Sequence, residues 1–190
     1  AHPLLLRLAV VLGLVNATYM ATLTMLVLYG QEVLGLTAFG YGVLLTVGAA
    51  GAVIGGLSAP AIASRIGTRA SLLAGLASFA LSYLLMAATS SVFVTGAALF
   101  IEAAGGMLWN VVTVSYRQRI IPDAILGRVN SIYRFFGWGM MPVGALAGGL
   151  IVTLSEPSIG RLASLHAPYW VAGAGGVALL AYGAMRLRLE

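Results

Sequence analysis

Long apolar runs are the feature that most constrains what this chain can fold into. A helix needs about 20 apolar residues to cross a hydrocarbon core of about 30 Å. Six runs of this kind stand between polar breaks, at residues 5–29, 41–63, 70–88, 92–116, 129–154 and 168–186. Strands of a membrane barrel would alternate polar and apolar residues over about ten positions, whereas these runs are continuous. The sequence predicts an all-α membrane protein, a single domain of six transmembrane helices over residues 1–190.

The composition indicates that lipid is the solvent of this chain. It is 61% hydrophobic and only 8% charged, whereas a soluble domain carries about 25% charged residues. The net charge of +5 comes from arginines that fall between the apolar runs, so we expect the lipid bilayer as a partner and no nucleic acid. The chain has no cysteine, and its histidines, His2 and His166, lie far apart. We therefore expect no metal site and no cofactor.

The arginines also predict the orientation, because short cytoplasmic loops retain basic residues. One side of the predicted membrane collects nine of the ten arginines, namely Arg7, Arg65, Arg69, Arg117, Arg119, Arg128, Arg134, Arg186 and Arg188. The other side holds Arg161, close in sequence to Glu156 and His166 and on the same side as Glu32. We expect a multi-pass protein of the plasma (cytoplasmic) membrane with both termini in the cytoplasm, which requires an even number of spans.

Pairs of glycines four residues apart let a neighbouring helix approach closely. Gly51 and Gly55 form such a pair in the second run, and Gly144 and Gly148 form another in the fifth. Each pair lies in the middle member of a group of three helices, which favours a three-plus-three repeat of the kind found in many secondary transporters. Ordinary helix packing explains each pair without a ligand.

The break between the second and third runs, residues 60–69, resembles a loop signature of the major facilitator superfamily of transporters. That signature is Gly-x-x-x-Asp-(Arg/Lys)-x-Gly-(Arg/Lys)-(Arg/Lys), between the second and third helices of each half. The residues that match are Arg65, Gly67 and Arg69, and those that depart from it are Pro60, Ser64 and Thr68. In this superfamily the degenerate form belongs mainly to the C-terminal half. The missing Asp puts in doubt any gating role that depends on it.

Two further stretches carry the resemblance along the chain. Residues 118–131, with Gly127 and Arg128, followed by Pro142 and Gly144, resemble the loop between helices ten and eleven of drug- and siderophore-exporter-like members. Residues 34–44 resemble the start of helix eight. The resemblance implies helices seven to twelve of an exporter-like transporter, in which a small molecule crosses by alternating access with proton coupling. It also implies a partner, an N-terminal six-helix half that is covalent or separate.

The arginines of the first loop allow two interpretations. Arg65 and Arg69 can anchor the turn, by donating to exposed carbonyls at a helix C-terminus or by reaching lipid phosphates. Alternatively, they form an ion pair across the cytoplasmic face that breaks as the two halves move. Gly67 permits a tight turn in either case.

Polar residues inside the runs are costly in lipid and therefore point to function. Glu102 is the one acid within a run. Helical spacing places Gly106, Trp109, Thr113 and Tyr116 near its face, so this stripe is a candidate cavity lining. Asn110 lies about 80° away and need not share it. Glu102 either takes and releases a proton during transport or stays protonated in a bond to a neighbouring helix.

Three more polar residues are candidates. Asn16 and Tyr19 form a second polar patch in the first run, which lines the substrate and proton pathway or makes an interhelical hydrogen bond. Arg134, near the start of the fifth run, either snorkels to the cytoplasmic surface or faces the cavity, with snorkelling the default.

The motifs of membrane enzymes are missing from the sequence. There is no His-Glu-x-x-His, no Gly-x-Ser-x-Gly and no Walker loop, so we do not expect an enzyme. A small oligomeric channel with Glu102 repeated around a pore remains an alternative function, as does a non-transporting six-helix membrane fragment. Because the chain begins at Ala1 and has six runs, we expect a fragment or one half of a complex.

Overall fold

The computed structural model describes residues 3–187, and within that range the chain is helical with no strand. The elements are α1 (Pro3–Leu28), a short π-helix η1 (Tyr29–Val33), α2 (Ala38–Ala87), α3 (Val92–Ile120), α4 (Asp123–Ile159) and α5 (Arg161–Arg186). Four helical stretches are long and apolar enough to cross a membrane: Leu5–Val33, Ala38–Ala87, Val92–Ile120 and Ala124–Ile159. The predicted all-α membrane class is confirmed. His2 and Arg188, which entered the sequence analysis, lie outside the described residues.

Five α-helices are present in the described part of the chain, where the sequence predicts six. The predicted runs 41–63 and 70–88 both fall within α2, which has non-helical backbone angles at Gly67 (φ 81°, ψ 165°). This conformation is open to glycine because glycine has no Cβ. Gly67 divides α2 into a first arm, residues 38–66, and a second arm, residues 68–87. The two arms meet directly at this residue, so no loop separates them.

Hydroxyl side chains inside the helices donate back to their own backbone. Thr18 donates to the carbonyl of Val15 at 2.8 Å, and Thr24 donates to that of Met20 at 2.8 Å. Such bonds satisfy the hydroxyl group of the side chain, for which lipid offers no hydrogen-bond partner. Thr37 precedes α2 and caps it, because its Oγ1 accepts from the amide of Gly40 at 3.3 Å. The local sequence thus makes long helices possible in an apolar solvent.

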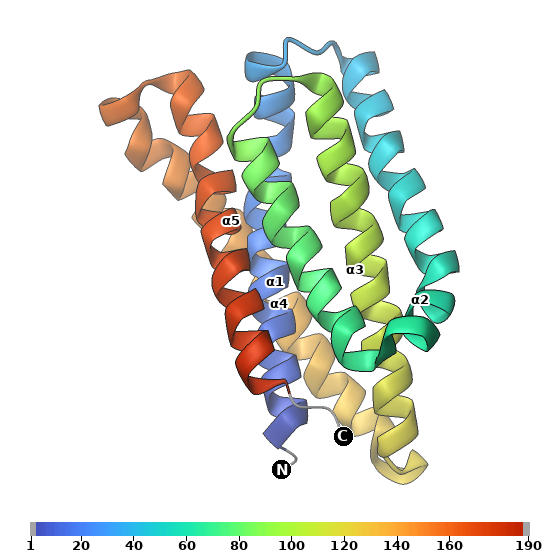
Figure 1. The fold of residues 1–190 in the computed structure, drawn as a ribbon. Helices are drawn as coiled ribbons and strands as arrows, with labels where there is room; N and C mark the ends of the chain where they lie inside the picture. The colour runs from blue at the N-terminus through green and yellow to red at the C-terminus, as the bar shows by residue number, and fades with distance from the viewer. Residues whose placement is uncertain (1–2, 188–190) are drawn as a thin grey trace.

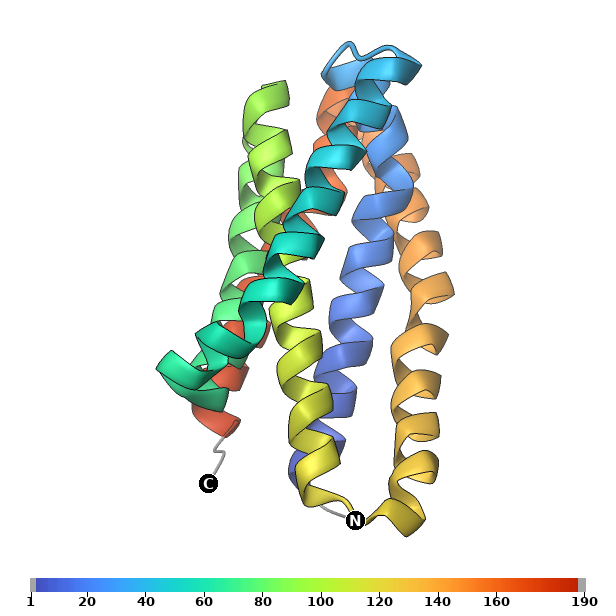
Figure 2. The same ribbon diagram turned by 90° about the vertical axis from the view of Figure 1, so that its right-hand side faces the viewer.

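The helices pack as a pair, α1 with α4, and a group of three, α2 with α3 and α5 (Figures 1 and 2). α1 runs along α4, and α2 runs along α3 and α5, whereas α3 and α4 scarcely touch. The first arm of α2 packs on α3, and the second arm also faces α5, where Gly176 approaches the backbone of Ala80. This arrangement leaves a separation between α3 and α4 through the middle of the molecule.

The glycine pairs mark the closest helix contacts. The backbone contacts are Gly51 with Phe100, Gly55 with Ala104, Gly144 with Ala17, and Gly148 with Ala21. A Cβ on Gly55 would lie 2.5 Å from the Cα of Ala104, which is too close for any side chain. Each pair therefore presses its helix against a neighbouring backbone, as expected of helix packing between small residues.

The chain turns alternately at two ends of the bundle (Figures 1 and 2). One end holds the start of α1, the Gly67 turn, the turn between α3 and α4, and the end of α5; there Arg7 donates to the carbonyl of Arg186 at 3.1 Å. The other end holds η1 and the turns that lead into α3 and α5. Among the described arginines, Arg161 is the one in a segment at this second end.

Candidate functional site

A cavity of about 860 Å³ lies between α1, the first arm of α2, α3 and α4, with Phe79 of the second arm at its wall. It occupies the region where α3 and α4 scarcely touch each other. Six of the candidate residues from the sequence line it: Asn16, Tyr19, Glu102, Trp109, Asn110 and Thr113. The structure therefore brings together, from α1 and α3, side chains that lie far apart in the sequence. Tyr116, which was predicted to share the stripe of Glu102, lines a smaller pocket beside Gly67 instead.

Glu102 lies in the wall of this cavity and is 7% exposed. Its Oε1 accepts a hydrogen bond of 3.0 Å from the hydroxyl of Tyr83. Tyr83 belongs to the second arm of α2 and is itself buried, so the bond joins two helices within the bundle. Among the described residues, the carboxyl group thus has Tyr83 as its hydrogen-bond donor and borders the cavity.

The polar patch on α1 divides into two roles. Asn16 donates from Nδ2 to the carbonyl of Gly137 on α4 at 3.0 Å, so it makes the interhelical hydrogen bond that was one of its two interpretations. Tyr19 is half-buried and lines the cavity. Both side chains therefore border the space between α1 and α3, although the amide of Asn16 is already engaged.

The stripe on α3 is wider than the helical period suggested. Trp109 and Thr113 are buried and line the cavity, and Asn110 lines it too. Asn110 lines the cavity even though it lies about 80° around the helix from Glu102, because the opening beside α3 exposes a broad face of the helix. Thr113 donates to the carbonyl of Trp109 at 2.8 Å, so its hydroxyl hydrogen is not free for a ligand. Asn110 has an unengaged side chain among the described hydrogen bonds.

The cavity also has a basic end, of which Arg134 was a candidate from the sequence and Arg117 was missed. It is lined by Arg117, Gln118, Asn130, Tyr133 and Arg134. Arg117 was assigned to a cytoplasmic loop, but α3 continues to Ile120 and buries the side chain. The signal was present in the spacing, since Arg117 follows Thr113 by one helical turn. Arg134 borders the cavity, and its guanidinium lies 6.0 Å from the ring centroid of Trp138.

Comparison with known families decides the relationship of the chain. A family model described as the MFS_1 like family matches residues 1–159. The chain belongs to this family of the major facilitator superfamily. The match runs through α1, α2, α3 and α4, which are the helices that line the cavity. No curated protein was found to match the chain. With its long apolar helices, membership of this family identifies a multi-pass membrane protein.

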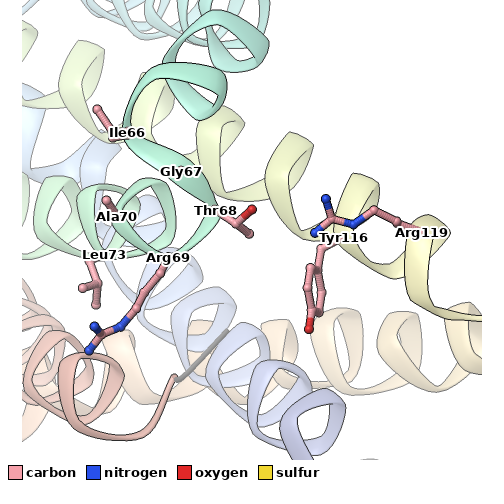
Figure 3. A pocket seen from close by; sticks show the side chains of 8 residues that line it. All are labelled: Ile66, Gly67, Thr68, Arg69, Ala70, Leu73, Tyr116 and Arg119. Carbon is pink, nitrogen blue, oxygen red and sulfur yellow. The ribbon is translucent and has the colours of Figure 1, made fainter. Parts of the chain in front are cut away.

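The superfamily-like turn at Gly67 borders a second, smaller pocket of about 480 Å³ (Figure 3). Arg69 points away from the turn towards α5 and donates to the carbonyls of Leu187 at 3.0 Å and Ala184 at 2.7 Å. It therefore caps the C-terminal end of α5, in agreement with the anchoring interpretation. Arg65 is exposed and has no hydrogen bond among the described residues.

On the far side of this pocket, Arg119 and Tyr116 project from the end of α3 (Figure 3). The Arg119 guanidinium lies 5.7 Å from the ring centroid of Tyr116. Gly127 and Arg128 lie in the first two turns of α4 and line neither pocket. Of the second motif, residues 118–131, Arg119 therefore shares the smaller pocket with the Gly67 turn, whereas Gly127 and Arg128 do not.

The opposite end of the bundle is joined by an arginine between two glutamates. Arg161 donates to both carboxylate oxygens of Glu32 at 2.8 Å and to Oε2 of Glu156 at 3.1 Å. These hydrogen bonds raise the pKa of Arg161 above its ordinary value, with Glu32 contributing most. The cluster ties η1, the end of α4 and the start of α5. No group of three or more potential metal ligands occurs within the part of the chain that the structure describes.

Proposed function

We propose that this chain is one half of a secondary active transporter, which moves a small molecule across the cytoplasmic membrane by alternating access. The observation that carries the proposal is the central cavity, with a buried carboxyl group in its wall and with two helices that scarcely touch on either side. Membership of the MFS_1 like family supports the same function. A weakly joined pair of helices can separate and close at little cost in packing.

Internal symmetry supports a six-span, three-plus-three repeat. Four glycines of α2 each precede a glycine of the α4–α5 region by 93 positions: Gly51 and Gly144, Gly55 and Gly148, Gly56 and Gly149, Gly67 and Gly160. The last pair has the same backbone angles, φ 81° and ψ 165°. In this repeat, α1 and the two arms of α2 correspond to α3, α4 and α5. The middle helix of each group packs on the first helix of the other group: the first arm of α2 packs on α3, and α4 packs on α1. A two-fold repeat requires this reciprocal packing. In this proposal, the two arms of α2 are separate spans.

Proton coupling is proposed through Glu102. A carboxyl group in the membrane is costly when charged and unpaired, and here its one protein donor is Tyr83. Protonation from the cavity neutralises the group and removes this cost, so the two protonation states favour different arrangements of the surrounding helices. The proposal includes a drug-like or siderophore-like solute, an N-terminal six-helix half as partner, and no enzymatic reaction.

The test measures access to the cavity and does not require the solute. The chain has no cysteine, so an Asn110→Cys variant in lipid vesicles carries a single thiol in the cavity wall. We expect a membrane-impermeant maleimide to label it from one side at a time, at a rate that depends on pH. Because thiolate formation alone speeds the reaction as pH rises, each rate is divided by that of the same cysteine in a Glu102→Gln background.

The ratio of rates is expected to change with pH in the variant that retains Glu102. A Glu156→Gln control removes a carboxylate at the exposed end of the bundle and should keep the pH dependence. A ratio that stays constant across the pH range would exclude proton coupling through Glu102. Simultaneous labelling from both sides would instead indicate an open channel.

A further inference from the structure

The basic end of the cavity contains a buried guanidinium with an unsatisfied hydrogen-bond donor. Arg117 is 9% exposed, and its Nε has no hydrogen-bond acceptor among the described atoms. Removing a guanidinium from water is costly unless its donors are satisfied. The two ion pairs found among the described side chains both involve Arg161, at the other end of the bundle. Arg117 therefore presents, at the wall of the cavity, a positive charge that no carboxylate of the described residues pairs with.

The position of Arg117 is fixed by its neighbours. Its guanidinium lies 4.2 Å from the ring centroid of Tyr133 on α4. Tyr133 in turn donates from its hydroxyl to the carbonyl of Leu5 on α1 at 2.6 Å. The arginine is thus held between α3 and α4 on a ring that α1 anchors, so little rotamer freedom is left to lose when a ligand binds.

The buried acid of the same cavity cannot neutralise Arg117. Glu102 precedes it by fifteen positions on α3, which corresponds to about 22 Å along a helix. Its carboxylate is also engaged by Tyr83. Arg134 adds a second positive charge to the wall, and Asn130 adds an amide. One end of the cavity is therefore basic, while Leu12, Val15 and Met107 contribute to an apolar lining elsewhere.

We propose that Arg117 and Arg134 bind the anionic group of an amphipathic molecule whose apolar body occupies the rest of the cavity. The group is a carboxylate, a sulfonate or a phosphate, since these accept the paired donors of a guanidinium. This inference rests on the proposed function in taking the cavity as the substrate site, and it names the class of substrate. The anion arrives either on a solute or as the headgroup of a lipid from the adjacent leaflet.

Three dansyl probes test the inference: dansylglycine, which is anionic, dansylamide, which is neutral, and dansylcadaverine, which is cationic. The full chain is placed in nanodiscs of zwitterionic lipid. Binding is followed by energy transfer from Trp109 and Trp138, which both line the cavity. We expect saturable binding of dansylglycine, with an affinity about tenfold or more above that of the other two probes, as one charge-assisted contact provides.

The variants identify the residues. Arg117→Gln and Arg134→Gln should each weaken dansylglycine binding by about tenfold and leave dansylamide binding unchanged, and Arg117→Lys should restore part of the loss. Arg119→Gln is the matched control, because Arg119 is exposed and lines the smaller pocket instead. Equal affinities for the three probes, or an equal loss in Arg119→Gln, would overturn the proposal.

A final arm separates the two sources of the anion. Nanodiscs containing phosphatidylglycerol should leave dansylglycine binding unchanged if the site takes a solute, and should suppress it in competition if the site takes a lipid headgroup. Both results retain anion binding at Arg117. The assay uses no gradient, so its outcome is independent of transport. Anion binding together with simultaneous labelling of Asn110→Cys from both sides would overturn the proposed function alone. One-sided labelling of Asn110→Cys without anion binding would overturn this inference alone.

Discussion

At the scale of single residues, the contact between Tyr83 and Glu102 is a hydrogen bond between two side chains that are both buried in the bundle. The hydroxyl and the carboxylate oxygen are 3.0 Å apart, and both side chains are buried. A hydrogen bond in an apolar surrounding gains strength because water does not compete for it. The bond also fixes where the carboxyl group stands relative to the cavity.

Replacing Tyr83 by Phe tests the value of this bond. We expect the free energy of unfolding to fall by about 0.5–2 kcal/mol, the range found for hydrogen bonds between membrane helices. Denaturant titration in mixed micelles measures the loss. Tyr182→Phe is the control, since Tyr182 is more than a third exposed and has no hydrogen bond in the described chain. A double-mutant cycle with Glu102→Ala that gives no coupling energy would contradict this account.

The candidate residues show what helical spacing can and cannot predict. Glu102, Trp109 and Thr113 line one space because they repeat along a single helix, whereas Tyr116, predicted for the same stripe, lines the smaller pocket. Tyr83 was missed as the partner of Glu102, since a contact between α2 and α3 depends on how the two helices pack. Arg117 was assigned to a loop because a charge usually ends an apolar run, and sequence spacing does not show that the helix continues past it.

At the scale of elements, the closest contact between α1 and α4 is made by glycines. Gly148 touches the backbone of Ala21, whereas a Cβ on the adjacent Gly149 would meet nothing within 4 Å. Gly148 and Gly149 are neighbours on the same helix, and they differ in the space available for an added methyl group. This pair provides an internal comparison for the energetics of helix contact.

Gly148→Ala is expected to lower the free energy of unfolding by about 1–3 kcal/mol, because the backbone of α1 has to move away from the added methyl group. Gly149→Ala should be neutral or stabilise the helix by up to about 1 kcal/mol, because alanine is the better helix former. Both values come from the same denaturant titration. Equal effects at the two positions would show that α1 and α4 are not packed at this contact.

The ends of the helices were the part of the fold that hydropathy described least well. The run predicted at 168–186 corresponds to α5, which begins at Arg161 with a charged first turn. The runs at 41–63 and 70–88 are joined in α2. Apolar composition reports the part of a helix that contacts lipid, whereas the helix itself extends until its backbone changes direction. Here that change occurs at Gly67 and Gly160, which share the same angles.

At the scale of the whole molecule, the second arm of α2 determines the topology. Residues 68–87 form a helix of about 30 Å, which matches the thickness of a hydrocarbon core. If this arm crosses the membrane by itself, the Gly67 turn and the turn at residues 88–91 lie on opposite sides. We expect the arginine-rich end of the bundle to be the cytoplasmic end, since short translocated loops lack basic residues.

Two single-cysteine variants of this cysteine-free chain test the arrangement. Ser64→Cys lies just before the Gly67 turn and Ser90→Cys lies between α2 and α3, and both positions are exposed. We expect an impermeant maleimide to label Ser90→Cys in intact cells and Ser64→Cys in inverted vesicles only. Labelling of both positions from one side would mean that the second arm does not span the membrane, which would break the three-plus-three repeat. Reversed labelling would retain the repeat and place the basic end of the cavity outside the cell.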